Sequence, residues 1–330
     1  MSRFRIGLVI NPTAGLGKGA SVGVKVRDLF AKHDIDVADL SAHNAKDALA
    51  RARAACISGL DALVVVGGDG MVNLGVNATI GTETPLGIVA AGSGNDFATA
   101  IELPVRHLTQ SVDVIIAALE SGHVKAFDAA QVEPHVLVSQ HARFGRVDAQ
   151  ATAAHSDTSR RWFAGSLSVG FDAAVNAQAN TYKWPKGHLK YLRAVVACLV
   201  SFKPFGYKIT VDGKTFESRG TLAAISNSPL FGGGLPIAPM ADMHDGMLDL
   251  VFATPLTKPE IMAILPKLYK GGHVGHEAVS FQKGKKILIE PSSIGPLPPV
   301  AFADGEVVGT APLEVTAHAG VLRILVPQDH

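Results

Sequence analysis

The sequence predicts two folded domains: an α/β domain with an open, mostly parallel, doubly wound sheet, and after it a domain of mostly antiparallel β-structure. Three observations support this prediction. Apolar strand-like runs alternate with helical patterns over residues 1–125, which is typical of βα units. Shorter apolar runs recur between turn signals from about residue 124 onward, which indicates antiparallel strands. The length of 330 residues is ample for two domains.

In the first domain, strands are predicted at residues 4–10, 62–66 and 86–90, with a further short apolar segment at 37–40. Helices are predicted where apolar side chains keep helical spacing, as Val22, Val26 and Phe30 do. The predicted helices cover residues 20–33, 47–59, 72–78 and 108–122. Ligands bind at the carboxyl ends of the strands in such sheets, so the turns after these strands are the candidate sites.

In the second domain, the apolar runs predict short strands between turns. They cover residues 132–138, 162–169, 207–211, 221–226, 247–253, 286–290, 300–303 and 320–326. Two helices interrupt them, at 187–202 and 258–269, and the polar residues 143–161 predict a long loop.

Composition excludes several classes of function. Hydrophobic residues make up 47% and charged residues 18%, so the chain is globular, and a net charge of +1 predicts no nucleic-acid partner. Cys56 and Cys198 lie far apart in apolar settings and are expected to be reduced thiols. The N-terminus enters a strand at once, which does not resemble a signal peptide. No apolar run approaches the roughly 20 residues of a membrane span, so we expect a cytoplasmic protein, soluble or peripheral to a membrane.

Three glycine-containing turns follow predicted strands: residues 11–15, 67–70 and 92–96. Glycines let a backbone approach phosphate closely, and Asp69 in the second turn can hold Mg²⁺ or water on Mg²⁺. Each turn also has an ordinary interpretation: a plain βα connection, an Asp-Gly hairpin turn, and a helix start capped by Asn95 or Asp96. Because the three turns share one edge of the predicted sheet, the sequence favours a polyphosphate site.

Two more motifs stand in the second domain. Asp242, Asp245 and Asp249 cluster around an Asp-Gly step, which suits either a turn or a hard cation held by a carboxylate and backbone carbonyls. Asp304-Gly305-Glu306 has the form of a two-residue hairpin turn.

Together these motifs resemble the diacylglycerol kinase catalytic family of lipid kinases, which includes sphingosine kinases and bacterial soluble diacylglycerol kinases. The family signature runs N-P-x-[AS]-G, G-G-D-G-T-x-N-E, G-T-x-N-D-F-A and a late D-G-E. It stands here, in the same order, at residues 11–15, 67–74, 92–98 and 304–306. The sequence departs at Met71, where the family has Thr, and at Leu74, where it has Glu.

The resemblance implies a nucleotide-binding α/β domain of the NAD kinase and phosphofructokinase type, residues 1–127 with 312–330 returning to it. It also implies a β-sandwich lipid-substrate domain, residues 128–311, and an active site in the cleft between the two. The implied co-substrate is ATP, with Mg²⁺. The nucleotide-binding positions are Asn11, Pro12, Thr13, Ala14, Gly15, Ser41, Gly67, Gly68, Asp69, Gly70, Met71, Val72, Asn73, Ser93, Gly94 and Asn95.

The remaining implied roles concern acidic residues. Asp69, Asp96 and Asp128 fall on the network that holds catalytic Mg²⁺ through water, and Glu306 falls on the general base. Asp245, with the backbone carbonyls of Asp242 and Met247, falls on a structural Mg²⁺ site.

The implied activity is transfer of the γ-phosphoryl group of ATP to a lipid hydroxyl, with diacylglycerol as the first candidate and phosphatidic acid as its product. A sphingoid base, phosphatidylglycerol or another lipid alcohol stays open as the acceptor. Two alternatives are an NAD kinase-like enzyme, which the late D-G-E disfavours, and a catalytically weak nucleotide- or lipid-binding protein, which Met71 and Leu74 suggest.

A lipid acceptor lies in a bilayer, so we expect transient docking at the inner face of the membrane. Residues 182–193 are the predicted contact, because aromatic and basic side chains alternate there. The alternative is a tryptophan packed into the sandwich beside a solvated basic helix face. The sequence leaves a homodimer open.

Overall fold

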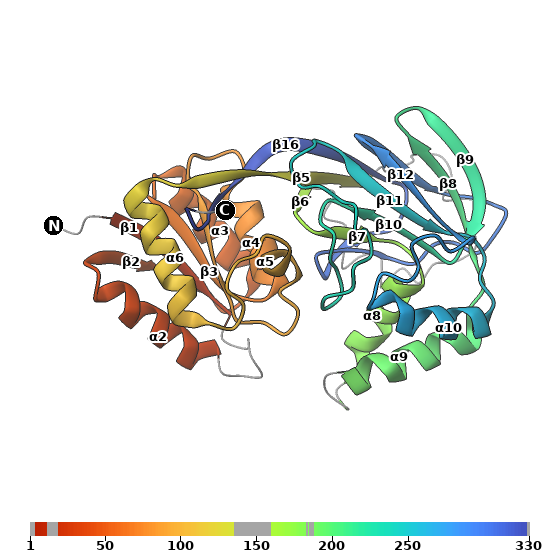
Figure 1. Ribbon diagram of the computed structural model, residues 1–330, viewed down its shortest axis with the longest axis horizontal. Helices are drawn as coiled ribbons and strands as arrows, with labels where there is room; N and C mark the ends of the chain where they lie inside the picture. The colour runs from red at the N-terminus through yellow and green to blue at the C-terminus, as the bar shows by residue number, and fades with distance from the viewer. Residues whose placement is uncertain (1–3, 12–18, 135–159, 183, 185–187, 329–330) are drawn as a thin grey trace.

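A computed structural model describes residues 4–11, 19–134, 160–182, 184 and 188–328, and Figure 1 shows two lobes bridged by long strands. Predictions that fall on residues 12–18 and 135–159, including the first glycine turn and most of the predicted polar loop, lie outside the described residues.

The first lobe is a parallel sheet with helices on both faces, as predicted. Its strands are ordered β2 (Ile35–Asp39), β1 (Phe4–Ile10), β3 (Ala62–Gly67) and β4 (Leu86–Ala90). Helices α2 (Gly19–Ala31) and α6 (Leu108–Ser121) pack on one face, and α3 (Ala45–Ile57) and α4 (Asp69–Thr79) on the other. Because both faces are covered, β3 is buried along its whole length, which explains its unbroken apolar run. A short helix, α5 (Asp96–Ala100), follows β4.

Two long strands join this lobe to the second one. β5 (Val124–Pro134) and β16 (Leu313–Leu325) pair antiparallel along most of their length. One end of β16 pairs with β4 at Ile324 and Leu86, and the other end pairs with β13 (Lys286–Pro291). The sheet continues through β8 (Phe205–Val211) and β9 (Lys214–Gly220), and β6 (Arg161–Phe163) pairs with β5, so in the described part of the chain ten strands form one sheet across both lobes.

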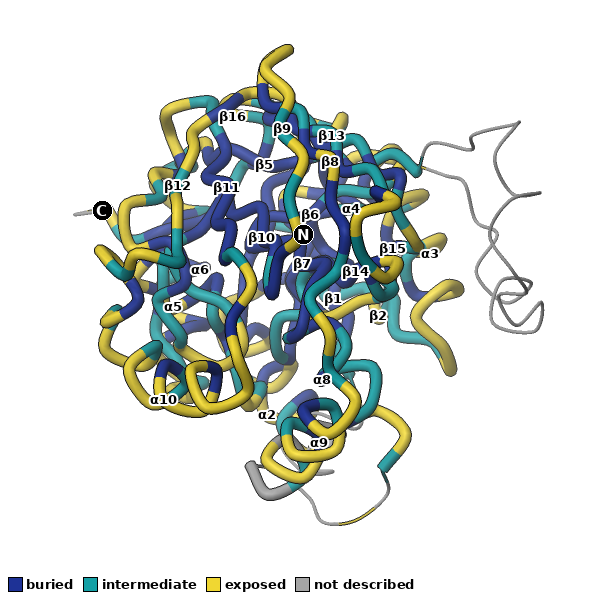
Figure 2. The backbone as a smooth tube through the Cα atoms, turned by 90° about the vertical axis from the view of Figure 1, so that its right-hand side faces the viewer, coloured by how far each residue is buried: buried dark blue, intermediate teal, exposed yellow. Residues whose placement is uncertain are grey.

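The second sheet covers the far half of this shared sheet. Its strands are ordered β12 (Val279–Gly284), β11 (Leu248–Ala253), β10 (Leu222–Ser226), β7 (Ser166–Ser168), β14 (Ala301–Ala303) and β15 (Glu306–Gly309). Side chains such as Ile209 and Ile287 from one sheet pack with Leu167 and Leu250 from the other in one core. The predicted β-sandwich is therefore present, and Figure 2 shows its buried strands inside exposed backbone at the periphery.

Three helices close one end of the sandwich: α8 (Phe171–Thr181), α9 (His188–Ser201) and α10 (Lys258–Leu268) (Figure 1). The predictions at 187–202 and 258–269 correspond to α9 and α10. The sequence did not predict α8, because it is rich in Ala and Asn and has no strong apolar stripe. Strands β9 and β12 were also missed, since they are partly exposed and carry polar side chains.

The predicted boundary between residues 127 and 128 falls within β5, and the predicted return at residue 312 falls just before β16.

Both cysteines are free thiols. Among the described residues, no helix combines the length and the apolar character that crossing a membrane requires.

Candidate active site

The second and third glycine turns lie against each other at the carboxyl ends of β3 and β4. The amides of Ala91 and Gly92 donate to the carbonyl of Gly67 at 2.8 and 3.1 Å. A Cβ on Gly92 would lie only 2.3 Å from the Cα of Gly68, so the approach requires glycine. The two turns thus form one surface of backbone, as expected for a site that binds phosphate.

Two residues from the predicted nucleotide positions lie near this edge, just after β1 and β2 end. The Asn11 amide donates to the carbonyl of Val66 at 3.2 Å, and Ser41 Oγ accepts from the Ile10 amide at 3.0 Å. The four residues Pro12, Thr13, Ala14 and Gly15 lie outside the described residues.

Asn95 shapes the third turn from within. It has left-handed backbone (φ 65°), and its side chain is almost completely buried. Its Oδ1 accepts from the Gly92 amide and its Nδ2 donates to the Gly92 carbonyl, both at 2.9 Å. Its carboxamide therefore holds the turn closed.

Asp69 stands in the first turn of α4 and links the two turns. Its carboxylate accepts from the amides of Asn95 at 2.8 Å and Phe97 at 3.4 Å. A Cβ on Gly94 would meet Asp69 Oδ2 at 2.5 Å, so Gly94 leaves room for the carboxylate.

Asp96 reaches from the first lobe to the second. Its carboxylate accepts from the amide of Gly233 at 2.9 Å and from that of Gly234 at 2.6 Å. Burial raises the pKa of Asp96, and the negative charge of Asp69 adds to this, whereas the bonds from Gly233 and Gly234 oppose it. Two acidic side chains thus repel each other beside the glycine turns.

Asp128 is a buried junction between β5, β16 and the loop before β11. Its carboxylate accepts from the Gly246 amide at 2.6 Å and from the Gly320 amide at 2.8 Å. Its own amide donates to the carbonyl of Met243. These bonds tie the loop that carries Asp242 and Asp245 to the two strands that cross between the lobes.

Glu306 comes from the second lobe to the start of α4. It is the first residue of β15 and is exposed. Its Oε1 lies 3.1 Å from where a Cβ on Gly70 would stand, so its carboxylate rests against the second glycine turn. The late D-G-E and the early G-G-D-G, more than 200 residues apart in the chain, are neighbours in space.

The other predicted nucleotide positions on α4 serve packing and the contact between lobes. Met71, Val72 and Leu74 are buried in the core beneath the sheet, and the amides of Met71 and Val72 donate to the carbonyl of Gly68 at 2.9 and 3.2 Å. The two departures from the family signature are therefore core side chains. Asn73 Nδ2 donates across the lobes to the carbonyl of Trp162 at 3.1 Å and to Asp304 Oδ2 at 3.3 Å.

The Asp245 loop already holds a positive charge. One carboxylate oxygen of Asp245 accepts from the Met247 amide at 2.9 Å, and the other contacts Lys283 Nζ at 2.6 Å. This hydrogen bond, together with the charges of Asp249, Asp245 and Asp242, raises the pKa of Lys283. The arrangement does not fit a divalent cation at Asp245 while Lys283 stays in place. Among the described residues, no group of three or more His, Cys, Asp or Glu side chains is placed to hold a metal ion.

Sequence reasoning missed three residues of this region. Asp304 was predicted only as part of the turn and of the D-G-E motif, without a role of its own, and Lys283 lay in no motif. Arg106 Nη2 donates to the carbonyl of Ser93 at 2.8 Å, which puts an exposed guanidinium beside the third glycine turn. Only the fold brings Arg106 and Lys283 to these positions, so no local pattern could have identified them.

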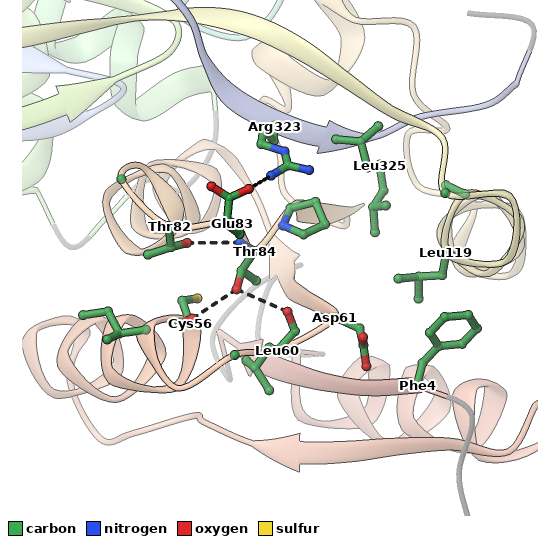
Figure 3. Close-up of a pocket in the computed structure, with 17 residues that line it drawn as sticks. Phe4, Cys56, Leu60, Asp61, Thr82, Glu83, Thr84, Leu119, Arg323 and Leu325 are labelled. Atoms are coloured by element: carbon green, nitrogen blue, oxygen red, sulfur yellow. Dashed lines mark hydrogen bonds and ion pairs between the residues drawn. The ribbon is translucent and has the colours of Figure 1, made fainter.

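A hollow of about 690 Å³, shown in Figure 3, lies at the opposite edge of the parallel sheet. Phe4, Asp61 and Pro85 line it, at the amino ends of β1, β3 and β4. Arg323 and Glu83 form an ion pair there, and Thr84 Oγ1 donates to the carbonyl of Cys56. This hollow is distinct from the glycine-turn site.

Two family models match successive parts of the chain. Residues 5–132 match the family described as the diacylglycerol kinase catalytic domain, and residues 165–326 match the YegS C-terminal NAD kinase beta sandwich-like domain. A solved structure of a diacylglycerol kinase from Bacillus anthracis has the same fold, with a TM-score of 0.67 and 19% identity over 100% of this chain and 99% of that one.

Relatives named diacylglycerol kinase are similar along the whole chain. The Mycobacterium tuberculosis protein is 29% identical over 99% of this chain and 98% of its own length. The Bacillus subtilis protein is 24% identical over 100% and 98%. The chain thus carries a match to the diacylglycerol kinase catalytic domain followed by one to the YegS C-terminal domain, and it is similar along its whole length to proteins named diacylglycerol kinase. It is a lipid kinase.

Proposed function

We propose that this lipid kinase transfers the γ-phosphoryl group of ATP to the hydroxyl of diacylglycerol, giving phosphatidic acid. The observation that carries the proposal is the position of Glu306, whose carboxylate from the second lobe rests against Gly70 in the glycine turns of the first. Phosphoryl transfer needs its donor, its acceptor and a charged environment brought together, and the contact of the two lobes at Gly70 and Glu306 supplies this.

The nucleotide binds mainly to backbone. The two glycine turns and the N-terminus of α4 offer amide groups and a partial positive charge to a polyphosphate. The proposed contacts are the residues predicted above, with Ser41 and Ser93 acting through their hydroxyl groups. Asn11 and the four residues after it complete this edge.

Asp69 and Asp96 are the proposed holders of Mg²⁺. They fit it, because two mutually repelling carboxylates are hard oxygen donors that a divalent cation stabilises. The chemistry that Mg²⁺ supplies when bound is neutralisation of charge on the phosphate oxygens. Asp128 holds the loop before β11 through its bonds to Gly246 and Gly320, and the resemblance adds it to the same acidic network.

Glu306 is the proposed general base. It approaches from the second lobe, where the lipid binds, and it accepts the proton of the acceptor hydroxyl as the bond to phosphorus forms. Proton removal late in the transfer adds modest catalysis to positioning and charge neutralisation.

The decisive experiment is transfer of radiolabelled phosphate from ATP to a panel of diacylglycerol, sphingosine, phosphatidylglycerol and NAD. We expect labelled phosphatidic acid above all other products. Label on another lipid alcohol would correct the acceptor but keep the lipid kinase. Label on NAD alone would identify an NAD kinase, and binding of ATP without any transfer would identify a binding protein.

The helical end of the second lobe is the proposed membrane contact. Leu192, Val196 and Val200 recur at every fourth residue of α9 and are 55%, 52% and 73% exposed, and Trp184 just before the helix is 77% exposed. We call these four side chains the α9 surface. Trp184 is therefore not packed into the sandwich, which was the alternative expectation.

Cations lie beside the α9 surface. Arg193 Nη1 donates to the carbonyl of Trp184 at 2.9 Å, and its guanidinium lies 4.2 Å from the centre of the Tyr182 ring. Exposed apolar side chains next to basic ones suit the headgroup region of an anionic bilayer. We therefore propose transient docking at the inner face of the membrane, in a cytoplasmic protein. Lys183 and Lys186 of the predicted contact lie outside the described residues. The homodimer stays open.

A further inference from the structure

We propose that Asp304 is a positioning residue that docks the hairpin carrying Glu306 onto α4 and thereby sets the Glu306 carboxylate over the glycine turns. This inference rests on the proposed function, because it takes Glu306 as the base. As a positioning residue, Asp304 contacts neither the nucleotide nor the lipid.

The hairpin presents the two acidic residues to different partners. Asp304 and Gly305 form the turn between β14 and β15, with φ values of 48° and 84°, the backbone of a tight two-residue hairpin. Glu306 follows and rests against Gly70. Asp304 instead turns its carboxylate inward, toward the segment between β6 and β7.

Four donors converge on that carboxylate. Oδ1 accepts from the amides of Gly165 at 3.0 Å and Ser166 at 3.1 Å. Oδ2 accepts from the Ala164 amide at 3.0 Å and from Asn73 Nδ2 at 3.3 Å. The Asp304 amide returns a bond to the Ser166 carbonyl at 3.1 Å. Hydrogen bonds to an ionised acceptor are stronger than neutral ones, so this carboxylate anchors the turn firmly.

The anchor includes the nucleotide lobe. Asn73 lies on α4 one helical turn after Gly70, so the helix that begins the glycine site is bonded directly to the hairpin turn. One further turn along, Asn77 and Trp162 exchange two bonds, Asn77 Nδ2 to the Trp162 carbonyl at 2.8 Å and the Trp162 amide to Asn77 Oδ1 at 2.9 Å. Hydrogen bonds therefore join α4, β6 and the hairpin of β14 and β15 to one another.

Gly165 shows that the fit around Asp304 is tight. A Cβ on Gly165 would lie 2.5 Å from Asp304 Oδ1 and 3.5 Å from its Cγ, and it would meet no other residue's atoms within 4 Å beyond its chain neighbours. The backbone of Gly165 is outside the left-handed region, so an alanine there is opposed by the Asp304 carboxylate alone.

The chain contains a matched control for Asp304. Asp212 and Gly213 form the turn between β8 and β9, with φ values of 45° and 83°. The Asp212 carboxylate also accepts from backbone amides, those of Lys285 at 3.0 Å and Lys286 at 2.8 Å. It is the same residue in the same type of turn with the same type of bonds, but these bonds hold only strands of the second lobe together.

The first test compares Asp304→Asn with Asp212→Asn. The substitution replaces one carboxylate oxygen, an acceptor, with an NH₂ group, which is a donor. That NH₂ group would face the N–H donors that surround the carboxylate, so the hairpin should detach from α4. We expect kcat for phosphoryl transfer to fall at least about tenfold in Asp304→Asn, with KM for ATP within about twofold, as for a displaced general base. Asp212→Asn should keep both constants within about twofold. Equal kcat values in the two variants, or a KM effect alone, would overturn the proposal.

The second test is a double-mutant cycle with Gly165→Ala and Asp304→Ala. Each single change should lower kcat. In the double variant the added methyl group no longer meets a carboxylate, so its kcat should equal that of Asp304→Ala. Losses that multiply instead would show that Gly165 and Asp304 act separately, and would contradict the proposal. Gly165→Ala keeps all charges, so it carries the test if Asp304→Asn does not fold.

A third measurement needs no turnover. With Trp184→Phe as background, emission reports on Trp162 beside the Asp304 anchor. The emission should shift in Asp304→Asn and stay constant in Asp212→Asn. Unchanged emission in both would refute the docking role. A wild-type protein that transfers no phosphate to any acceptor would instead refute the proposed function.

Discussion

At the scale of single residues, the acidic side chains of the candidate site are held mainly by backbone amides. Asp69, Asp96, Asp128 and Asp304 each accept from two or more of them. Such bonds fix a carboxylate in one orientation, which a site for charged ligands requires. Glu306 differs, because its carboxylate rests against Gly70 and is exposed, as a proton acceptor for an incoming substrate should be.

Replacing the proposed base tests its role directly. Glu306→Gln keeps the shape of the side chain but cannot accept a proton at neutral pH, so kcat should fall by about 10²–10⁴-fold while ATP affinity stays unchanged. Steady-state kinetics with titration of ATP binding measures both, and Glu277→Gln, at another exposed glutamate, is the control. Lost ATP affinity with kcat retained would make Glu306 a nucleotide ligand.

Lys283 gives a prediction about metal binding. Its ammonium group contacts Asp245 at 2.6 Å, where the resemblance places a structural Mg²⁺. Removing that charge should open the site, so the rise in Tm with added Mg²⁺ should be larger in Lys283→Gln than in wild type and Lys285→Gln, which keep only the proposed site at Asp69 and Asp96. Thermal denaturation with Mg²⁺ and with EDTA measures this. An equal Mg²⁺ effect in all three proteins would show that Lys283 does not replace the cation.

At the scale of elements, the helical end of the sandwich combines a packed face with an exposed apolar one. Ala194 and Leu199 of α9 are buried against α8 and α10, while Val196 and Val200 face outward. Apolar side chains that recur on the outer face of a helix are costly in water, so they indicate a surface that is covered when the protein works.

Vesicle sedimentation tests that interpretation. With phosphatidylcholine vesicles that contain phosphatidylglycerol, the bound fraction should exceed that with phosphatidylcholine alone and should decrease with added salt. Val196→Asp with Val200→Asp should lose most of the binding, because charged groups oppose insertion into the interface. Val24→Asp on α2 is the matched control, since Val24 is a valine 58% exposed on a helix of the other lobe. If the control lost as much binding, the α9 surface would not be the contact.

At the scale of the whole molecule, β5 and β16 make one sheet of two lobes, and the Asp304 anchor adds a second connection between them. The shared sheet and the Asp304 anchor therefore both fix the position of one lobe relative to the other near the site. The unfolding free energy of the protein depends on pH through this residue, because burial raises the pKa of Asp304 to about 6.

The sign of this dependence follows from linkage. A carboxyl whose pKa is higher in the folded protein contributes stability that is fully present below its unfolded value of 3.8 and is lost as pH rises through about 6. Relative to Asp304→Asn, wild type should therefore gain up to about 1 kcal/mol of unfolding free energy between pH 7 and pH 5. Urea denaturation at both pH values measures the difference. A difference that shrinks as pH falls would mean that the pKa of Asp304 is not raised.

Local pattern determined much of the fold. Strands β1, β3 and β4 and helices α2, α3 and α6 were predictable, because both faces of the parallel sheet are covered and the apolar periodicity is strong. The first half of β16 was missed, although its alternation of apolar and polar side chains is typical of a half-buried strand, and the prediction covered only residues 320–326. The shared sheet was therefore not predicted.

By itself, the sequence determined the fold class and the order of the family motifs, because these depend on residue type and short-range spacing. Only the tertiary structure decided which of those residues meet. It placed Glu306 against Gly70, joined Asn73 to Asp304, brought Lys283 to Asp245, and buried Met71 and Leu74 in the core. The physical reason is that contacts between residues far apart in the chain depend on strand order and on the packing of two lobes, which leave no local pattern in the sequence.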